Sequence, residues 1–279
     1  MVRVVFFLGL VLICLDSYSQ KESTWWYFYR NAGIQFSNGT PVADINANDS
    51  ASSYVLGANS YGGGNIASIS NRSTGQLLFY ASAIGVFNRN HRSMPNGLPL
   101  MTSPYQSTNI ISAATEEGTI IVPKPGHNDK FYFFHTRTAT DLYEDGHVSG
   151  LFFSLIDMEL DNGLGDVVDT LKNVYIIDST EEKISATPHA NGIDYWLMVR
   201  QGGTNNYHAF LITENGISGN PITTSLGLPS TVYHTQQGNL RFNHKGNIMA
   251  HTRGDNLEIF DFDNATGVLS NLRSVNSLG

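Results

Sequence analysis

Short apolar segments, each paired with a polar turn, recur along this chain. Four stretches share one pattern: a strand-like segment, a turn rich in Gly, Asn and Asp, a strongly apolar segment and a further strand-like segment. The four turns lie at residues 71–75, 126–129, 190–194 and 244–247. Their spacing of roughly 50 to 65 residues is near the range of β-propeller blades. The pattern therefore predicts a repeat of small antiparallel sheets.

The strongest apolar segments do not alternate with polar residues. They are residues 131–134 (FYFF), 151–153 (LFF) and 196–199 (WLMV). A strand with one wet face alternates, so these strands are expected to be buried on both faces. No amphipathic helix of about a dozen residues separates them, which argues against a parallel sheet flanked by helices. Radially stacked propeller blades cover both faces of each sheet. A two-sheet sandwich is the alternative.

We therefore predict an all-β fold, a β-propeller of the WD40/YVTN-like kind. Its repeats are expected near residues 65–115, 116–180, 181–236 and 237–279, after a strand-like segment that begins at Trp25. Propellers typically have about 4 to 8 blades, and an incomplete ring leaves a blade edge unpaired. We expect either a small, irregular propeller or, preferably, the front part of a larger one.

The first nineteen residues have the features of a cleaved signal peptide. Arg3 precedes an apolar run at residues 4–14, and small residues precede a cleavage point before Gln20. The run is shorter than the roughly 20 residues that span a bilayer. Ile13 does not suit a lipoprotein signal, which needs a small residue directly before Cys14. We predict a signal peptide at residues 1–19, a propeller-like region at 20–279, and export to the periplasm, cell surface or medium.

Composition narrows the classes of partner. Cys14 is the only cysteine, so the mature chain of 279 − 19 = 260 residues depends on its core without disulfides. The net charge of −8 gives no support to a nucleic acid or an anionic membrane as partner. Only 14% of the residues are charged and 27 are Gly, a composition typical of β-rich proteins.

Several strings resemble a known family. They are WYFYRNAGIQFSNGTP (26–41), GQLLFY (75–80), VFNRNHRSMPNG (86–97), IIVPKPG (120–126), GLGDVV (163–168) and HANGIDYW (189–196). In this order they resemble the N-terminal propeller-like region of exported Bacteroidetes surface proteins, the type IX secretion and gliding-motility-associated group. The chain departs from that pattern at Tyr29, where the family usually has Gly, and no sorting domain follows Gly279. The resemblance implies location and architecture, and it implies no defined reaction.

The best candidate for a metal site is the string DMELDNGLGD at 157–166. Asp157, Glu159, Asp161 and Asp166 roughly match the alternate carboxylates of a calcium loop, but the EF-hand spacing and its terminal Glu are absent. A long Asn-Gly hairpin explains the same residues. The acidic turn that begins at Asp263 near the C-terminus is likewise interpreted as the turn of a blade. We predict no metal site and no cofactor.

The sequence carries no catalytic motif. It lacks a Gly-x-Ser-x-Gly elbow, and its nine histidines lack the spacing of a zinc site. Acidic groups such as Glu116-Glu117 and Glu181-Glu182 are interpreted as solvated turn residues. The tripeptide that begins at Arg253 (RGD) is interpreted as a hairpin loop. Of all the acidic residues in the chain, Asp157 and Glu159 are the least unsuitable for catalysis.

These observations favour a non-enzymatic, exported propeller. We expect it to act as a scaffold for interaction or adhesion at the cell surface, with a protein or glycan ligand and without a membrane span after signal cleavage. The alternative is a propeller-based polysaccharide hydrolase or lyase, which would bring two or more carboxylates together on the central channel.

Overall fold

In a computed structural model, the strands in the described part of this protein form five small antiparallel sheets. The structure describes residues 21–27, 33–37, 40–44, 65–82, 85–98, 100, 117–136, 150–230, 238–254 and 256–276. The predicted signal peptide lies outside the described residues. Within them, no helix has the length and apolar character needed to cross a membrane.

The five sheets follow one another in chain order. Sheet A contains β1 (Trp25–Tyr27), β2 (Gly33–Ser37) and β3 (Thr40–Asp44). Sheet B contains β4 (Ala67–Ser70), β5 (Leu77–Ala81) and β6 (Val86–Asn88). Sheet C contains β7 (Thr119–Pro123), β8 (Lys130–Thr136), β9 (Gly150–Asp157), β10 (Asp166–Val167) and β11 (Val174–Asp178). Two short 3-10 helices, Asp161–Gly163 and Asp169–Leu171, lie between the last three of these strands.

The other two sheets complete the described chain. Sheet D contains β12 (Thr180–Pro188), β13 (Tyr195–Gln201), β14 (Asn206–Thr213), β15 (Gly216–Ile217) and β16 (Ile222–Ser225). Sheet E contains β17 (Leu240–Phe242), β18 (Ile248–Arg253), β19 (Asn256–Asp263) and β20 (Val268–Asn276). Each sheet is a meander, because strands that are consecutive in the sequence pair with one another over most of its width.

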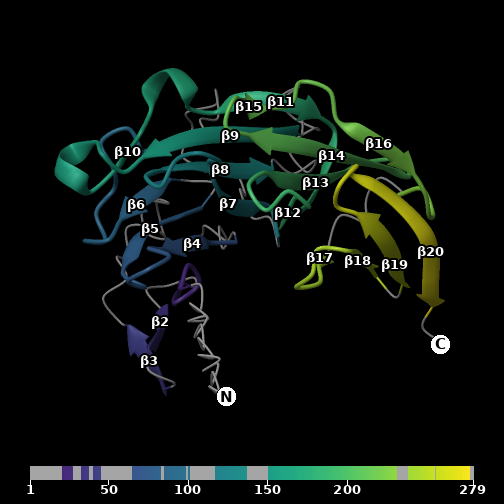
Figure 1. Cartoon of the computed structure of the whole chain (residues 1–279), viewed down its shortest axis with the longest axis horizontal. Helices are drawn as coiled ribbons and strands as arrows, with labels where there is room; N and C mark the ends of the chain where they lie inside the picture. Colours follow the sequence, from purple (N-terminus) through teal and green to yellow (C-terminus); the bar gives the residue numbers. More distant parts are fainter. Residues whose placement is uncertain are drawn as a thin grey trace, which may run out of the picture.

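The sheets are arranged along an arch (Figure 1). The first strands of sheets B to E, namely β4, β7, β12 and β17, lie on its concave side and contact one another in that order. We call these four the inner strands. The outer strands β11, β16 and β20 lie on the convex side. Sheets that are stacked side by side, each with its first strand innermost, are the arrangement of propeller blades.

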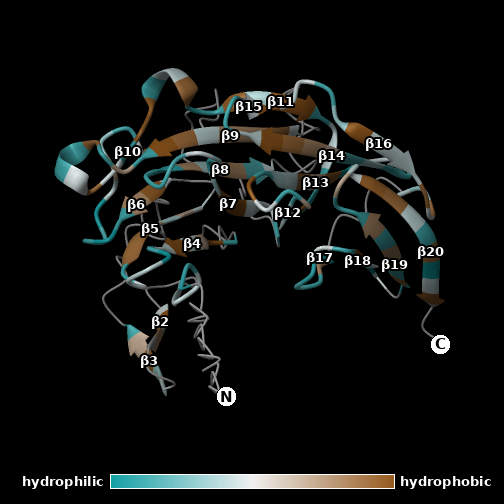
Figure 2. Cartoon of the chain, viewed as in Figure 1, coloured by the Kyte–Doolittle hydropathy of each residue, from teal (hydrophilic) through white to brown (hydrophobic). Residues whose placement is uncertain are grey.

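Apolar side chains fill the space between neighbouring sheets. Figure 2 shows strongly apolar stretches along β8, β9 and β13. Phe79 and Phe133 belong to the core between sheets B and C, and Phe134 and Leu197 to the core between sheets C and D. Met198 and Phe260 belong to the core between sheets D and E. A fully buried side chain of this size contributes about 1.5–3 kcal/mol.

The predicted all-β, propeller-like fold is therefore confirmed. The strands at residues 131–134 and 196–199 are apolar on both faces because a sheet covers each face. The two-sheet sandwich does not describe five sheets stacked in series.

The acidic stretch near the C-terminus forms a turn. Asp263 ends β19, and its carboxylate accepts hydrogen bonds from the Ala265 amide (2.9 Å) and the Thr266 hydroxyl (2.8 Å). Its carbonyl oxygen accepts a hydrogen bond from the Gly267 amide at 2.7 Å. Gly267 has a φ of 78° and lies against the Trp196 ring, so the chain can turn closely there into β20. The carboxylate and the carbonyl oxygen of Asp263 therefore both accept hydrogen bonds within the turn.

Candidate functional site

The predicted calcium-like string does not converge on one point. Asp157 ends β9, where its Oδ2 atom lies 2.5 Å from the Lys130 Nζ atom. Asp129 and Glu159 lie near it, and the three acids offer oxygens within 4.8 Å of one another. Lys130 also lies 3.7 Å from Asp129, so one ammonium group offsets part of the negative charge of this trio. Burial acts to raise the pKa of Asp157, but the hydrogen bonds from Lys130 and the Glu159 amide and the charge of Lys130 together outweigh it, and the pKa is lowered.

The other two predicted acids have separate roles. Asp161 begins a 3-10 turn with a φ of 46°, a left-handed backbone conformation. Asp166 lies in β10 and accepts hydrogen bonds from the Asn96 amide (2.8 Å), the Asn96 side chain (2.9 Å) and its neighbour Val167 (2.8 Å). It ties the turn after β6 to sheet C. The Asp166 carboxylate therefore has a structural role and Asp161 contributes its backbone to a turn, whereas Asp157 and Glu159 lie beside Lys130.

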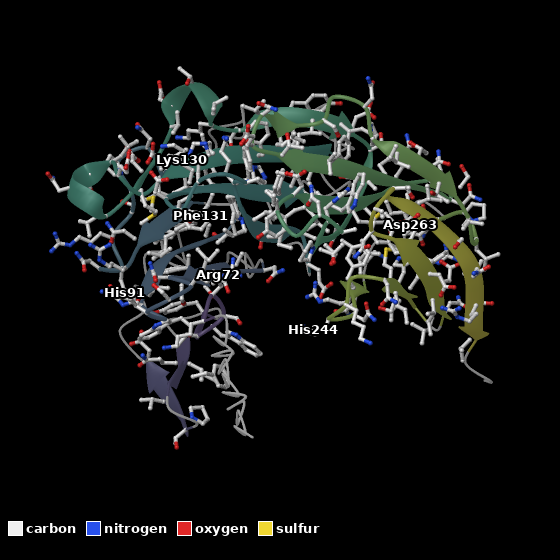
Figure 3. The ribbon with its side chains drawn as sticks, in the orientation of Figure 1. Arg72, His91, Lys130, Phe131, His244 and Asp263 are labelled. Carbon is white, nitrogen blue, oxygen red and sulfur yellow. The ribbon has the colours of Figure 1, made fainter. Side chains whose placement is uncertain are left out.

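That group also lies at the end of sheet C opposite the start of β7. Thr119, at the start of β7, pairs with His135, whereas Lys130 pairs with Asp157 at the other end of the sheet. Figure 3 shows Lys130 on the convex side of the arch, well away from His244 on the turn after β17. Asp157 and Glu159 are thus poorly placed to meet a second carboxylate on the inner strands.

A second set of charged residues lies on and behind the inner strands. We call it the inner-strand cluster, and it consists of Glu117, Glu181, Lys183, Arg200, Tyr207, Arg241, His251, Arg253 and Glu258. Eight of these nine residues are buried, and Arg241 is the exposed member. Charged groups are rarely buried unless they are paired, so their mutual contacts define the site.

Glu181 and Lys183, on β12, form the centre of the cluster. The Lys183 Nζ atom lies 3.1 Å from Glu181 Oε2, and Arg200 Nη1 lies 3.2 Å from Glu181 Oε1. All three side chains are at most 1% exposed. The Lys183 ammonium also donates a 3.4 Å hydrogen bond to the Thr252 carbonyl oxygen. One carboxylate therefore holds two buried cations from neighbouring strands.

Three further residues form a chain of hydrogen bonds behind Glu181. The Tyr207 hydroxyl lies 2.8 Å from His251 Nδ1 and donates a 3.3 Å bond to Glu258 Oε2. His251 Nε2 lies 3.8 Å from Glu181 Oε2. Burial acts to raise the pKa of Glu258, but bonds from His251 and the Leu228 amide lower it to about 2. Glu258 is therefore ionised at neutral pH.

The cluster also anchors the connection between sheets D and E. Arg200 and Arg253 both donate hydrogen bonds to the Leu228 carbonyl oxygen, and Arg253 donates a second to the Pro229 carbonyl oxygen at 2.9 Å. Glu258 accepts a hydrogen bond from the Leu228 amide at 3.0 Å. Gly227, with a φ of 81°, lies so close to Glu258 that a Cβ atom would approach the carboxylate within 2.4 Å. The sequence therefore needs glycine at this position.

Glu117 connects the inner strands β7, β12 and β17. Its backbone precedes β7, and its carbonyl oxygen accepts a hydrogen bond from Ile184 of β12 at 3.2 Å. Its carboxylate reaches β17, where it accepts bonds from the Leu240 amide (3.2 Å) and the Arg241 guanidinium (2.5 Å). The Glu117 side chain is 10% exposed and that of Arg241 is 57% exposed. This pair is where the cluster meets solvent.

At this end of the cluster, burial shifts the pKa values of Glu117 and Lys183 in the directions that favour their neutral forms. Burial raises the pKa of Glu117, and the neighbouring Arg241, Leu240 amide and Lys183 offset only part of that effect. Burial also lowers the pKa of Lys183, although Glu181 opposes it. Perturbed titrations of adjacent groups are a feature of active sites as well as of structural ion networks. Glu117 lies just before β7 and pairs with the exposed Arg241 guanidinium, and Lys183 lies on the neighbouring inner strand β12.

The interpretation of the acids as solvated turn residues was wrong for this cluster. Glu117 is 8% exposed and Glu181 is fully buried, since β12 begins at Thr180 and the Glu181 side chain faces sheet E. Lys183, two positions after Glu181 in the same strand, was a signal in the sequence that these charges pair. Arg253 of the RGD tripeptide is also buried, with its guanidinium on Leu228 and Pro229.

Comparisons with solved structures agree with the fold. No family model and no curated protein matches the chain. The periplasmic gluconolactonase of Pseudomonas aeruginosa has a TM-score of 0.44 at 14% identity, covering 89% of this chain and 64% of its own. A Bacteroides fragilis protein assigned as a 6-phosphogluconolactonase has a TM-score of 0.35 at 14% identity, covering 87% and 63%. A β-propeller domain from Myceliophteria thermophila has a TM-score of 0.35 at 11% identity, covering 91% and 72%.

These comparisons contradict the predicted non-enzymatic scaffold. Two of the similar propellers are named as lactonases, which agrees better with the alternative of a propeller-based polysaccharide hydrolase or lyase than with the scaffold. The chain spans 64% of the length of the gluconolactonase. With identities of 11–14%, the likeness concerns the fold alone. The activity must therefore be argued from the residues of this chain.

Proposed function

We propose that this protein is a hydrolase whose active site is formed by Glu117, Lys183 and Arg241. The observation that carries the proposal is the hydrogen-bonded link from the start of β7 to β17 through Glu117. It brings a buried carboxyl group and an exposed guanidinium together beside a buried lysine of β12. Glu117 lies just before β7, whereas Lys183 and Arg241 lie on β12 and β17, so the site depends on the stacking of the blades.

Glu117 is the proton donor in this proposal. A carboxyl group with a raised pKa holds its proton closer to neutral pH and can give it to a leaving oxygen atom. When water attacks the acyl or glycosyl carbon of an ester, lactone or glycoside and the C–O bond breaks, this proton neutralises the leaving alkoxide, and the proton released by the attacking water restores Glu117. The 10% exposure of the side chain lets a substrate reach the carboxyl group while it remains largely desolvated.

Lys183 and Arg241 supply positive charge. Lys183 is fixed by Glu181, so its ammonium does not need to reorient when negative charge develops on the substrate. Arg241 presents a guanidinium of which more than half is exposed, and its five N–H donors suit the oxygen atoms of a sugar acid or polysaccharide. The proposed substrate class is therefore a carbohydrate or a carbohydrate-derived lactone.

Export remains part of the proposal on sequence grounds. The run at residues 4–14 and the small residues before Gln20 support a cleaved signal, and the resemblance to exported Bacteroidetes surface proteins agrees with it. A hydrolase outside the cytoplasm would act on external carbohydrate.

The test is a hydrolysis screen with purified, folded protein. The substrates are aldonolactones, aryl esters and neutral and acidic polysaccharides, and each is assayed with the wild type and with Glu117→Gln. The expected result is turnover of one class that falls at least about a hundredfold in the variant, as for loss of a general acid. Asp157→Asn is the matched control, because it also alters an acid paired with a cation but lies at the other end of sheet C. Turnover that survives Glu117→Gln, or its absence from folded wild type, would overturn the proposal.

A further inference from the structure

His251 is held in one orientation by two residues of the inner-strand cluster. The ring is fully buried, and its Nδ1 atom lies 2.8 Å from the Tyr207 hydroxyl oxygen. The same Nδ1 atom lies 3.3 Å from Glu258 Oε2, a carboxylate oxygen that can only accept, so a proton on Nδ1 makes this contact a hydrogen bond. The neutral ring therefore carries its proton on Nδ1.

The other ring nitrogen is left as a bare acceptor. His251 Nε2 makes no hydrogen bond and faces Glu181 Oε2, which is also an acceptor, at 3.8 Å. The same carboxylate oxygen lies 3.1 Å from Lys183 Nζ. Two acceptors do not attract each other, so the neutral ring leaves this oxygen to the lysine. A protonated ring would gain an Nε2–H donor and would compete for it.

We propose that His251 is a positioning residue for the hydrolytic site: its neutral ring lets Glu181 hold the Lys183 ammonium, and its protonated ring withdraws Glu181 from it. This inference rests on the proposed function, because Lys183 belongs to the proposed active site. His251 touches no substrate and acts only through Glu181. The consequence is a loss of activity on the acid side that a purely structural histidine would not produce.

The charges around the ring determine when it takes a proton. Glu181, Lys183 and Arg200 face it from sheet D, and Arg253 and Glu258 lie on its own sheet. Burial lowers the pKa of His251, and the two cations nearest to it, Lys183 and Arg200, lower it further against the opposing effects of Glu258 and Glu181. The ring is therefore neutral at pH 7 and becomes charged below its usual range.

The first experiment needs no substrate. The ring resonances of His251 and the side-chain resonances of Lys183 are followed by NMR as the pH is lowered in the wild type, with assignments made by selective labelling. We expect both residues to show an inflection at one common pH below the usual histidine range. A Lys183 signal that does not respond where His251 titrates would overturn the proposal, whether or not the protein is a hydrolase.

The second experiment uses the pH profile of hydrolysis. Wild-type kcat is expected to fall about tenfold per pH unit below the His251 midpoint, as for one required deprotonation. In His251→Gln that acid limb should move to lower pH. Tyr207→Phe keeps the ring but removes its partner, and it should move the midpoint in NMR and kinetics alike. His208→Gln is the control, since His208 binds Thr223 on the other face of β14. An unchanged acid limb in both test variants would refute the role.

The two experiments separate this inference from the proposed function. Common inflections without detectable hydrolysis would leave the His251–Glu181–Lys183 coupling intact and would remove the proposed reaction. Hydrolysis with independent titrations would keep the reaction and remove the positioning role.

Discussion

Acid should destabilise this fold through one buried histidine. His135 lies near the end of β8, is 1% exposed and stacks against Phe152 with ring centroids 5.6 Å apart. Its Nε2 atom lies 3.3 Å from the Asn173 side-chain oxygen, and its Nδ1 atom has no hydrogen-bond partner. Burial lowers the pKa of His135 from 6.5 to about 4, and the Asn173 contact offsets only part of this effect. The folded protein therefore takes up this proton less readily than the unfolded chain.

The sign and size of the effect follow from linkage. Because the folded pKa is the lower one, the stabilising contribution is fully present above pH 6.5 and is lost as the pH falls toward 4. The pKa difference of about 2.5 corresponds to about 3.5 kcal/mol in full, at about 1.4 kcal/mol per pKa unit. That amount is a large part of the roughly 5–15 kcal/mol that stabilises a typical domain.

The assay compares wild type with His135→Gln, which stays neutral at every pH. Denaturant unfolding is followed by circular dichroism at several values between pH 7.5 and about 4. The variant loses the ring stacking and is expected to be less stable at pH 7. The difference in free energy of unfolding between wild type and the variant should shrink by about 3 kcal/mol at pH 4. Only the wild type has a buried histidine whose protonation is unfavourable in the folded state. His244→Gln is the control, because His244 lies exposed on the turn after β17.

Parallel plots of the free energy of unfolding against pH for wild type and His135→Gln would refute the reasoning. If the free energies of unfolding of wild type and His135→Gln keep a constant difference between pH 7 and 4, the His135 ring is not held neutral by burial.

Three other outcomes are expected. Glu181→Gln leaves Arg200 and Lys183 without their carboxylate and should lower the free energy of unfolding at pH 7 by about 3–5 kcal/mol; a loss below about 1 kcal/mol would contradict the buried pairing. Gly267→Ala should be more destabilising than Gly192→Ala. Both positions have a positive φ, but only a Cβ at 267 meets the Trp196 ring, at 2.8 Å, so equal losses of thermal stability would argue against that contact. Mass spectrometry of the exported protein should show an N-terminus at Gln20, and an intact residue 1 would contradict the predicted signal.

The strands could be predicted from the sequence because their composition reports burial on both faces. Residues 131–134 and 196–199 are apolar at consecutive positions, and each lies in the second strand of its sheet between two neighbours. Turn residues marked the hairpins for a similar reason, as Gly126 and Gly192 both adopt a positive φ. In these strands and turns, the residues that form the sequence pattern are the same residues that determine the local backbone structure.

The inner-strand cluster could not be found in the same way. Glu117 and Arg241 are 124 positions apart, and their contact exists only because β7, β12 and β17 are stacked. An acid beside another acid, as in Glu116-Glu117, has the composition of a solvated turn, so local sequence favours the wrong environment. The string at 157–166 showed the reverse error. Its regular carboxylates suggested a common ligand, yet Asp166 binds Asn96 and Asp157 binds Lys130.

The central claim is that Glu117 gives a proton to the leaving group of a carbohydrate-derived substrate. The most direct measurement is kcat for wild type and Glu117→Gln on the best substrate, once as it stands and once with a leaving group that needs no protonation. The account predicts a loss of at least about a hundredfold on the first substrate and a much smaller loss on the second. Equal losses on the two substrates, or no loss on either, would contradict it.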